Sequence, residues 1–208
     1  MDEDVPSPID LRDPRDVAAW VAAADRTPWR VELRDAFAEL LRSTAPRPTR
    51  VLELGAGPGL LAETILRACQ PESYVLFDFS MPMLELSRER VGGYPSASFV
   101  LGDFKSPGWS GPLQRPFDAV VAMQAVHEIR HKRHVPGLYR EARSLLRAGG
   151  LLIVCDHNPL DASASAAALY ATEAEQHSAF AAAGFVQVRT ALALRGMYLC
   201  LGVNPAER

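Results

Sequence analysis

The sequence is poor in cysteine, with Cys69, Cys155 and Cys200 as its only three in 208 residues. They are far apart and lie in apolar surroundings, so they provide neither a disulfide framework nor the spacing of a zinc site. No apolar run reaches the roughly 18 residues that a membrane span requires. The first eight residues are acidic and contain two prolines, the opposite of a signal peptide. We therefore expect a cytoplasmic protein that makes no membrane contact.

The chain also lacks an excess of positive charge. It has 22 lysines and arginines against 25 acidic residues, a formal net charge of −3. No global field attracts a polyanion, so nucleic acid is not expected as a partner. One local run, Arg-His-Lys-Arg-His at 130–134, is basic. It is either a solvated loop or a contact for an acidic acceptor or a phosphate, and the sequence leaves this open.

The order of elements predicts one α/β domain. The strand-like runs at 118–122 and 151–154 are continuously apolar, which is typical of a parallel sheet buried on both faces. Hydrophobic periodicity and turn residues predict helices at 16–24, 29–42, 60–69, 81–90, 136–147 and 172–183, a linker at 45–49, and strands at 51–54, 74–78, 98–101, 117–122, 151–155, 186–188 and 197–201. The last two strands, joined through 194–196, indicate an antiparallel hairpin. The predicted fold is a doubly wound, mostly parallel, seven-stranded sheet.

The most informative stretch is Val51–Gly59, an apolar strand that ends in a glycine-rich turn before a helix. Gly55 and Gly57 remove side chains where the chain reverses, so a ligand can lie against bare backbone. A dinucleotide fingerprint would place its third glycine or alanine three positions after Gly57. Here Gly59 comes two positions later, and Glu53 lies inside the strand. The spacing thus disfavours a dinucleotide cofactor.

Three further segments follow in a matching order. The second strand ends at Asp78, 23 positions after Gly55, where a carboxylate can accept hydrogen bonds from both hydroxyls of a ribose. The segment 78–84 reads D-x-S-x-x-M-L, in which Ser80 is a helix N-cap. Gly102-Asp103-Phe104 follows the third strand, and a Gly-Gly turn at 149–150 precedes the fifth. The set indicates one nucleoside-containing ligand held by several strand ends.

Together these motifs resemble the class I S-adenosylmethionine-dependent methyltransferases. The resemblance is close over about residues 50–155 and extends to 172–203 by topology only. It implies a Rossmann-like methyltransferase fold, S-adenosyl-L-methionine as cofactor, an N-terminal helical lid at 1–48 within the same domain, and a catalytic domain at 49–208. The cofactor-binding residues that it implies are Glu53, Gly55, Ala56, Gly57, Asp78, Phe79, Met83, Asp103, Phe104 and Met123. Asp103 would accept a hydrogen bond from the adenine amino group.

A second motif points elsewhere. His127-Glu128-Ile129-Arg130-His131 spells H-E-x-x-H, which on a helix can bind zinc. Here it follows a buried strand, contains the charged Arg130, and has no third ligand at a known spacing. We therefore expect no metal at this place.

The acceptor of the methyl group would lie over the ends of the fourth and fifth strands. His127 is the best candidate for a general base there, because imidazole titrates near neutrality; alternatively it only packs the loop. The strand end lacks an [N/D]-P-P-[Y/F] loop and a Pro-Cys nucleophile, which disfavours DNA-amine, glutamine and base-carbon methylation. Trp20, Trp29 and Arg30 are candidate lid residues.

The sequence favours O- or N-methylation of a small organic acceptor. Two alternatives stay open: a protein or RNA methyltransferase that docks through 130–134, and a non-catalytic module that only binds S-adenosylmethionine. The oligomeric state and the acceptor are not determined by the sequence.

Overall fold

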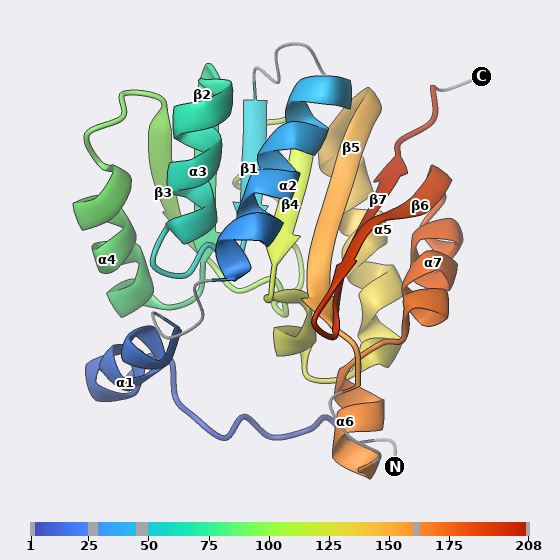
Figure 1. Cartoon of the computed structure of the whole chain (residues 1–208), viewed down its shortest axis with the longest axis horizontal. Coiled ribbons are helices and arrows are strands. Elements are labelled where there is room, and N and C mark those ends of the chain that lie inside the picture. Colours follow the sequence, from blue (N-terminus) through green and yellow to red (C-terminus); the bar gives the residue numbers. More distant parts are fainter. Residues whose placement is uncertain (1–2, 25–28, 45–49, 160–162, 207–208) are drawn as a thin grey trace.

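The chain folds around one seven-stranded sheet in a computed structural model that describes residues 3–24, 29–44, 50–159 and 163–206 (Figure 1). The predicted linker 45–49, and with it the proposed domain boundary at 48/49, lies outside the described residues. The strands of the sheet are β1 (Arg50–Leu54), β2 (Ser73–Asp78), β3 (Ala97–Leu101), β4 (Phe117–Met123), β5 (Leu146–His157), β6 (Val186–Leu194) and β7 (Met197–Val203). Its helices are α1 (Pro14–Ala24), α2 (Arg30–Thr44), α3 (Leu60–Cys69), α4 (Met81–Val91), α5 (Val135–Leu145), α6 (Ala164–Leu169) and α7 (Glu173–Ala182), with 3₁₀ turns η1 (Val126–Ile129) and η2 (Lys132–His134).

The strand order is β3-β2-β1-β4-β5-β7-β6. Strands β1 to β5 are parallel to one another, whereas β7 is antiparallel to both β5 and β6. The predicted fold class, including the antiparallel C-terminal hairpin, is confirmed. Because the order of the strands turns back between β1 and β4, loops that follow these two strands diverge and leave room for a ligand at their carboxyl ends.

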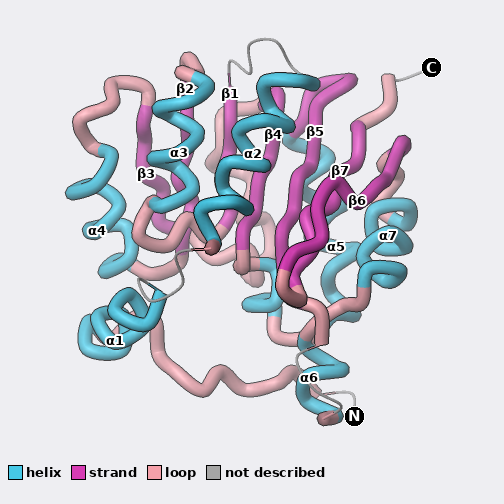
Figure 2. Tube along the Cα trace, in the orientation of Figure 1, coloured by secondary structure: helices cyan, strands magenta, loops and turns pink. Residues whose placement is uncertain are grey.

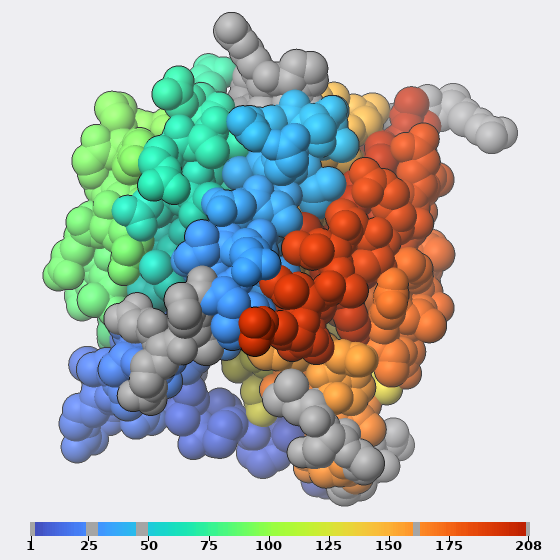
Figure 3. Space-filling view, in the orientation of Figure 1, coloured from blue at the N-terminus to red at the C-terminus, as the bar shows by residue number. Residues whose placement is uncertain are grey.

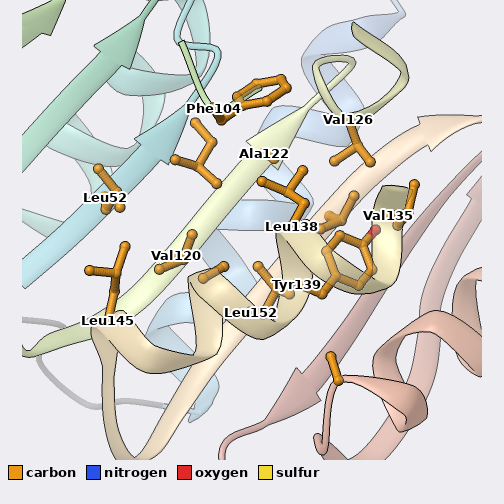
Figure 4. Packing of buried hydrophobic residues seen from close by; sticks show 14 of the residues in the cluster. Leu52, Phe104, Val120, Ala122, Val126, Val135, Leu138, Tyr139, Leu145 and Leu152 are labelled. Atoms are coloured by element: carbon orange, nitrogen blue, oxygen red, sulfur yellow. The ribbon is translucent and has the colours of Figure 1, made fainter. Parts of the chain in front are cut away.

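Two hydrophobic layers enclose the sheet. Leu33, Phe37 and Ile65, from α2 and α3, pack on one face with 0% exposed surface. On the other face, Leu138 and Tyr139 of α5 pack against the inner strands (Figure 4). Burial on both faces explains why the central strands are uniformly apolar rather than alternating. This core holds the carboxyl ends of β1, β4 and β5 in fixed positions.

Several predicted boundaries are wrong, and one helix was missed. Strand β6 extends over 186–194 instead of 186–188, because its residues alternate between half-buried and exposed and give only a weak apolar signal. The predicted turn before β5 lies inside that strand, which begins at Leu146 and changes register against β4. The short alanine-rich helix α6 lies where only a connection was expected. None of these changes moves the ends of β1, β2 and β4.

None of the helices within the described ranges is long and apolar enough to span a membrane.

Candidate active site

A cavity of about 280 Å³ opens at the carboxyl ends of β1, β2 and β4, near the lower end of the range of small-molecule sites. Its lining includes His127 and nine of the ten predicted cofactor residues, from segments far apart in the sequence. These nine are Glu53, Gly55, Ala56, Gly57, Asp78, Phe79, Met83, Phe104 and Met123. The fold thus brings these predicted residues together around one cavity. Of the ten predicted cofactor residues, only Asp103 is not part of its lining.

The glycine turn owes its shape to three residues with left-handed backbone. Gly55, Gly57 and Gly59 have φ of +66°, +54° and +78°. A Cβ on Gly55 would come within 2.4 Å of the Ala125 side chain, so glycine is required there for packing. A Cβ on Gly57 would meet nothing within 4 Å. The backbone at Gly57 is therefore bare toward open space, as the binding of a ligand against the loop requires.

Asp78 ties the glycine turn to the end of β2. Its side chain is 5% exposed and accepts hydrogen bonds from the backbone N–H of Gly57 and of Ser80, both at 2.8 Å. Burial raises the pKa of Asp78, while these backbone donors oppose the rise. Ser80 Oγ in turn accepts from Met83 N at 3.2 Å, so the predicted N-cap of α4 is present. The carboxylate lies at the cavity with lone pairs still free for a ribose.

Glu53 is a buried acid with one partner that the sequence did not reveal. Its side chain is 2% exposed, and Tyr74 Oη donates a hydrogen bond of 2.7 Å to Glu53 Oε2. Burial raises the pKa of Glu53 to about 8, although the Tyr74 hydrogen bond lowers it. Tyr74 is the second residue of β2 and lies opposite Val51, two residues before Glu53 on β1, so its contact with Glu53 depends on the register between the two strands.

Apolar side chains form another part of the wall. Phe79, Met83 and Phe104 line the cavity at the ends of β2 and β3 and offer flat or flexible surfaces to an aromatic ring. The guanidinium of Arg12 lies 4.9 Å from the centre of the Phe79 ring. Asp103 forms an ion pair of 3.6 Å with Arg12. Asp103 thus faces the segment before α1 rather than the cavity, and its adenine contact stays a prediction.

His127 forms a dyad with Asp156 from the end of β5. The distance from His127 Nδ1 to Asp156 Oδ1 is 2.8 Å, and Asp156 Oδ2 accepts from the His127 backbone N–H at 3.0 Å. Burial opposes the charge on the ring, but the Asp156 carboxylate outweighs it and raises the pKa of His127. Because Nδ1 is held by Asp156, Nε2 is the nitrogen available to a substrate; it lies 3.5 Å from Glu128 Oε1.

Tyr170 and Gln124 lie near this dyad, and the sequence did not predict either of them there. The Tyr170 ring, just after α6, lies 5.3 Å from the His127 ring and 5.6 Å from the His157 ring. Gln124 Nε2 lies 2.8 Å from His157 Nε2. Burial lowers the pKa of His157, and its contact with Gln124 suits a neutral ring. Tyr170 belongs to no motif, and nothing in its local sequence marks it.

The H-E-x-x-H motif does not form an α-helix. Residues 126–129 form a 3₁₀ turn, and Arg130 ends it with a φ of +70°. His131 Nδ1 accepts from the Arg133 backbone N–H at 3.1 Å, whereas His127 is bound to Asp156. Among the described residues, no three histidine, cysteine or acidic side chains are grouped as metal ligands.

The basic run 130–134 makes contacts within the chain. Arg130 is 8% exposed and donates to the backbone carbonyls of Val5 and Pro6, both at 2.8 Å. Lys132 pairs with Glu175 at 2.7 Å. Arg133 and His134 both contact Asp4 Oδ1, at 2.8 and 2.9 Å. Arg130 also contacts Glu128, and the Arg133 backbone N–H donates to His131. These contacts hold the segment that precedes α1.

That N-terminal segment crosses the edge of the sheet at which the cavity opens. Figure 2 shows it as a loop that runs from beside α6 to α1, beneath the strand ends. Ser80 Oγ donates a hydrogen bond to the Leu11 carbonyl. Leu11, Trp20 and Arg30 line the cavity, whereas Trp29 packs against the core next to α2. The segment 3–13, helix α1 and the first turn of α2 thus lie at the ligand side of the sheet, while the rest of α2 packs on its face.

The part of the chain that contributes most of this cavity is similar to known proteins. A family profile described as "Methyltransferase domain" matches residues 51–150. The chain is 27% identical over 121 residues to the malonyl-[acyl-carrier protein] O-methyltransferase of Halalkalibacterium halodurans, covering 58% of this chain and 44% of that protein. It is 35% identical over 115 residues to the polyketide synthase ThaG of Burkholderia thailandensis, covering 52% of this chain and 2% of that protein. The chain therefore spans less than half of the length of these relatives.

Solved structures with the same fold are also similar. An O-methyltransferase family protein from Burkholderia thailandensis superposes with a TM-score of 0.77 at 15% identity, covering 94% of this chain and 61% of that one. Human N-acetylserotonin methyltransferase, in complex with S-adenosylmethionine, gives a TM-score of 0.72 at 16% identity, covering 94% and 58%. At these identities the likeness concerns the fold.

Proposed function

The chain belongs to the class I S-adenosylmethionine-dependent methyltransferases through its residues 51–150, and we propose that it methylates an oxygen or nitrogen of a small organic acceptor. The observation that carries the proposal is the His127–Asp156 dyad, in which His127 lines the same cavity as the glycine turn and Asp78. One cavity thereby holds both the proposed cofactor site and His127, a titratable side chain that could act on the acceptor.

The residues of the cavity fit S-adenosylmethionine. The open space over Gly57 can receive the ligand against bare backbone, and Asp78 has acceptor capacity for ribose hydroxyls. Phe79, Met83 and Phe104 would enclose the adenine, and Met123 would line the sulfonium side. When bound, S-adenosylmethionine supplies an electrophilic methyl group on a positively charged sulfur. The chain's own task is then to align the acceptor and to exclude water.

His127 is the proposed general base. Its Nδ1 is oriented by Asp156, so Nε2 would accept a proton from an acceptor hydroxyl or amine as the new bond to carbon forms. The raised pKa of His127 makes it a stronger base than a free imidazole, and Asp156 would stabilise the imidazolium that results. Asp156 is a positioning residue, since its carboxylate binds the His127 ring and accepts from the backbone N–H groups of His127 and His157.

A small acceptor is supported by the N-terminal cover. We propose residues 1–48 as a lid within the same domain, because Leu11, Trp20 and Arg30 line the cavity. Docking of RNA or protein through 130–134 is less well supported, since those cations contact Val5, Pro6, Asp4 and Glu175 of the chain itself. The His127–Asp156 dyad favours catalysis over a module that only binds the cofactor.

A screen of acceptors tests the proposal. Purified protein and S-adenosylmethionine would be incubated with panels of phenols, amines, carboxylic acids, peptides and RNA, and release of S-adenosylhomocysteine would be measured. We expect release with at least one small molecule and none with RNA or peptides. Turnover of RNA or peptide alone would support the docking alternative. Cofactor binding with no release from any acceptor class would support the non-catalytic alternative.

A further inference from the structure

The start of α2 brings into the cavity a guanidinium that has no acidic partner among the described residues. Arg30 begins α2, and Arg34 lies one turn later on the same face; both side chains line the cavity. Within the described ranges neither arginine has an acidic partner within 4 Å, and Arg30 Nε is buried without a hydrogen-bond partner. Arg30 as a whole is half-buried, but a buried donor such as its Nε is costly unless a ligand completes its contacts.

The acidic side chains that line the cavity do not pair with Arg30. Glu53 is bonded to Tyr74, and Asp78 accepts from the backbone of Gly57 and Ser80. Glu128 contacts Arg130 at 3.4 Å and His127 at 3.5 Å. Each carboxylate therefore has partners other than Arg30. The charge of Arg30 is left for something that enters the cavity from outside.

Arg30 also lies on the acceptor side of the cavity. Arg30 lines the cavity together with His157 from the end of β5, the strand that carries Asp156. Burial lowers the pKa of His157, and the positive charge of Arg30 adds to that effect. The Trp29 ring lies 6.0 Å from the Arg30 guanidinium and 5.8 Å from that of Arg195, which follows β6. Figure 3 shows the β6–β7 hairpin lying against α2 on this face of the molecule. By contrast, the charges that act on Arg34 are those of Asp35, Arg90 and Glu63, the last in the first turn of α3.

We propose that Arg30 binds an anionic group of the acceptor, so that the substrate is an acidic small molecule held by a carboxylate beside His127. A guanidinium presents a planar fork of donors that matches a carboxylate. The inference rests on the proposed function, since it concerns the acceptor of the same site. The acceptor atom that loses its proton to His127 is then distinct from the carboxylate, which is already ionised at neutral pH.

A carboxylate in this cavity could also come from the amino-acid part of the cofactor, and the test separates the two sources. With S-adenosylhomocysteine bound, binding of benzoate, phenylacetate and octanoate would be compared with that of their primary amides by titration. We expect the wild-type protein to bind at least one acid about tenfold more tightly than its amide. Arg30→Gln should abolish that preference and change the affinity for S-adenosylhomocysteine less than about twofold. Arg195 also lies next to Trp29 but does not line the cavity. The control variant Arg195→Gln should therefore keep the preference for the acid over its amide.

Three outcomes would overturn the inference. Equal binding of acids and amides by the wild-type protein would remove the anion site, as would binding of neither. A loss of affinity in Arg30→Gln for S-adenosylhomocysteine but not for 5′-methylthioadenosine, which lacks the amino-acid part, would assign Arg30 to the cofactor. Failure of the wild-type protein to bind S-adenosylhomocysteine would instead overturn the proposed function itself.

Discussion

The two halves of the cavity are built in different ways. The half formed by β1 and β2 comes from short contiguous motifs, in which the Gly57 backbone N–H donates a hydrogen bond of 2.8 Å to the Asp78 carboxylate. The half formed by β4 and β5 is assembled from separate segments: His127, Asp156, Tyr170 and Arg30 meet only in the folded chain. The first half can recognise a constant ligand with local structure, while the second is free to vary with the acceptor.

This contrast predicts that substitutions in the two halves have separable effects. Changes near β1 and β2 should weaken cofactor binding, and changes near β4 and β5 should slow turnover with the cofactor still bound. A variant that altered both quantities equally would break the distinction.

The largest effect is expected for His127→Ala. Loss of a general base should lower turnover by roughly 10²–10⁴-fold, with the affinity for S-adenosylhomocysteine nearly unchanged. Steady-state kinetics and calorimetry on the same preparation would measure both. His131→Ala, the outer histidine of the H-E-x-x-H motif, is the control and should retain turnover. Zinc at about one ion per chain, lost in both variants, would contradict this mechanism.

Asp78→Ala should mainly affect binding. Two charge-assisted hydrogen bonds of about 1.5–3 kcal/mol each before solvent compensation would be lost, so affinity for S-adenosylhomocysteine should fall about tenfold or more. Since Asp78 also accepts from Gly57 and Ser80, thermal unfolding of the free variant must be measured alongside. Unchanged affinity in a folded variant would mean that the ribose lies elsewhere.

Asp156→Asn sharpens the assignment of the base through its pH dependence. In the proposed mechanism the unprotonated form of His127 is the active one. The value of kcat/KM should then rise with pH through the pKa of His127, which Asp156 holds above the ordinary value of 6.5. Without the carboxylate charge, burial remains and lowers that pKa. The rising limb should therefore move to lower pH, with a loss of maximal rate smaller than that of His127→Ala. A limb that stays in place would show that another group titrates.

The smallest effect is expected for Asp103→Ala. A single hydrogen bond to a neutral amine contributes about 0.5–1.5 kcal/mol, so affinity for S-adenosylhomocysteine should fall about two- to tenfold. Arg12→Ala frees Asp103 from its ion pair and should leave affinity equal or slightly higher. If Asp103 only anchors the N-terminal segment, both variants would instead change affinity to the same degree.

The same contrast explains how much of the site could be predicted from the sequence. Gly55, Gly57, Asp78 and Ser80 act through backbone that lies next to them or one β–α–β unit away, so spacing alone indicated their roles. The fold was predictable for a similar reason, because buried parallel strands are continuously apolar. β6 was underestimated because it pairs with only one strand and exposes alternate residues.

The half of the cavity formed by β4 and β5 could be predicted only in part. His127 was identified by its place after β4, but its orienting partner Asp156 depends on the register of β4 with β5. Tyr170 depends on the path of the chain through α6, a helix of six residues with little periodic signal. Arg30 depends on where α2 packs. Each of these contacts is set by tertiary packing, which local sequence patterns do not encode.

Calorimetric titration of the wild-type protein with S-adenosylhomocysteine and, separately, with NAD tests the central claim most directly. Both ligands contain adenosine, but only the first suits a turn whose third glycine is Gly59 and which is followed by Asp78 at the end of β2. We predict micromolar binding of S-adenosylhomocysteine, weakened in Asp78→Ala, and no binding of NAD. Tight binding of NAD without binding of S-adenosylhomocysteine would contradict the account.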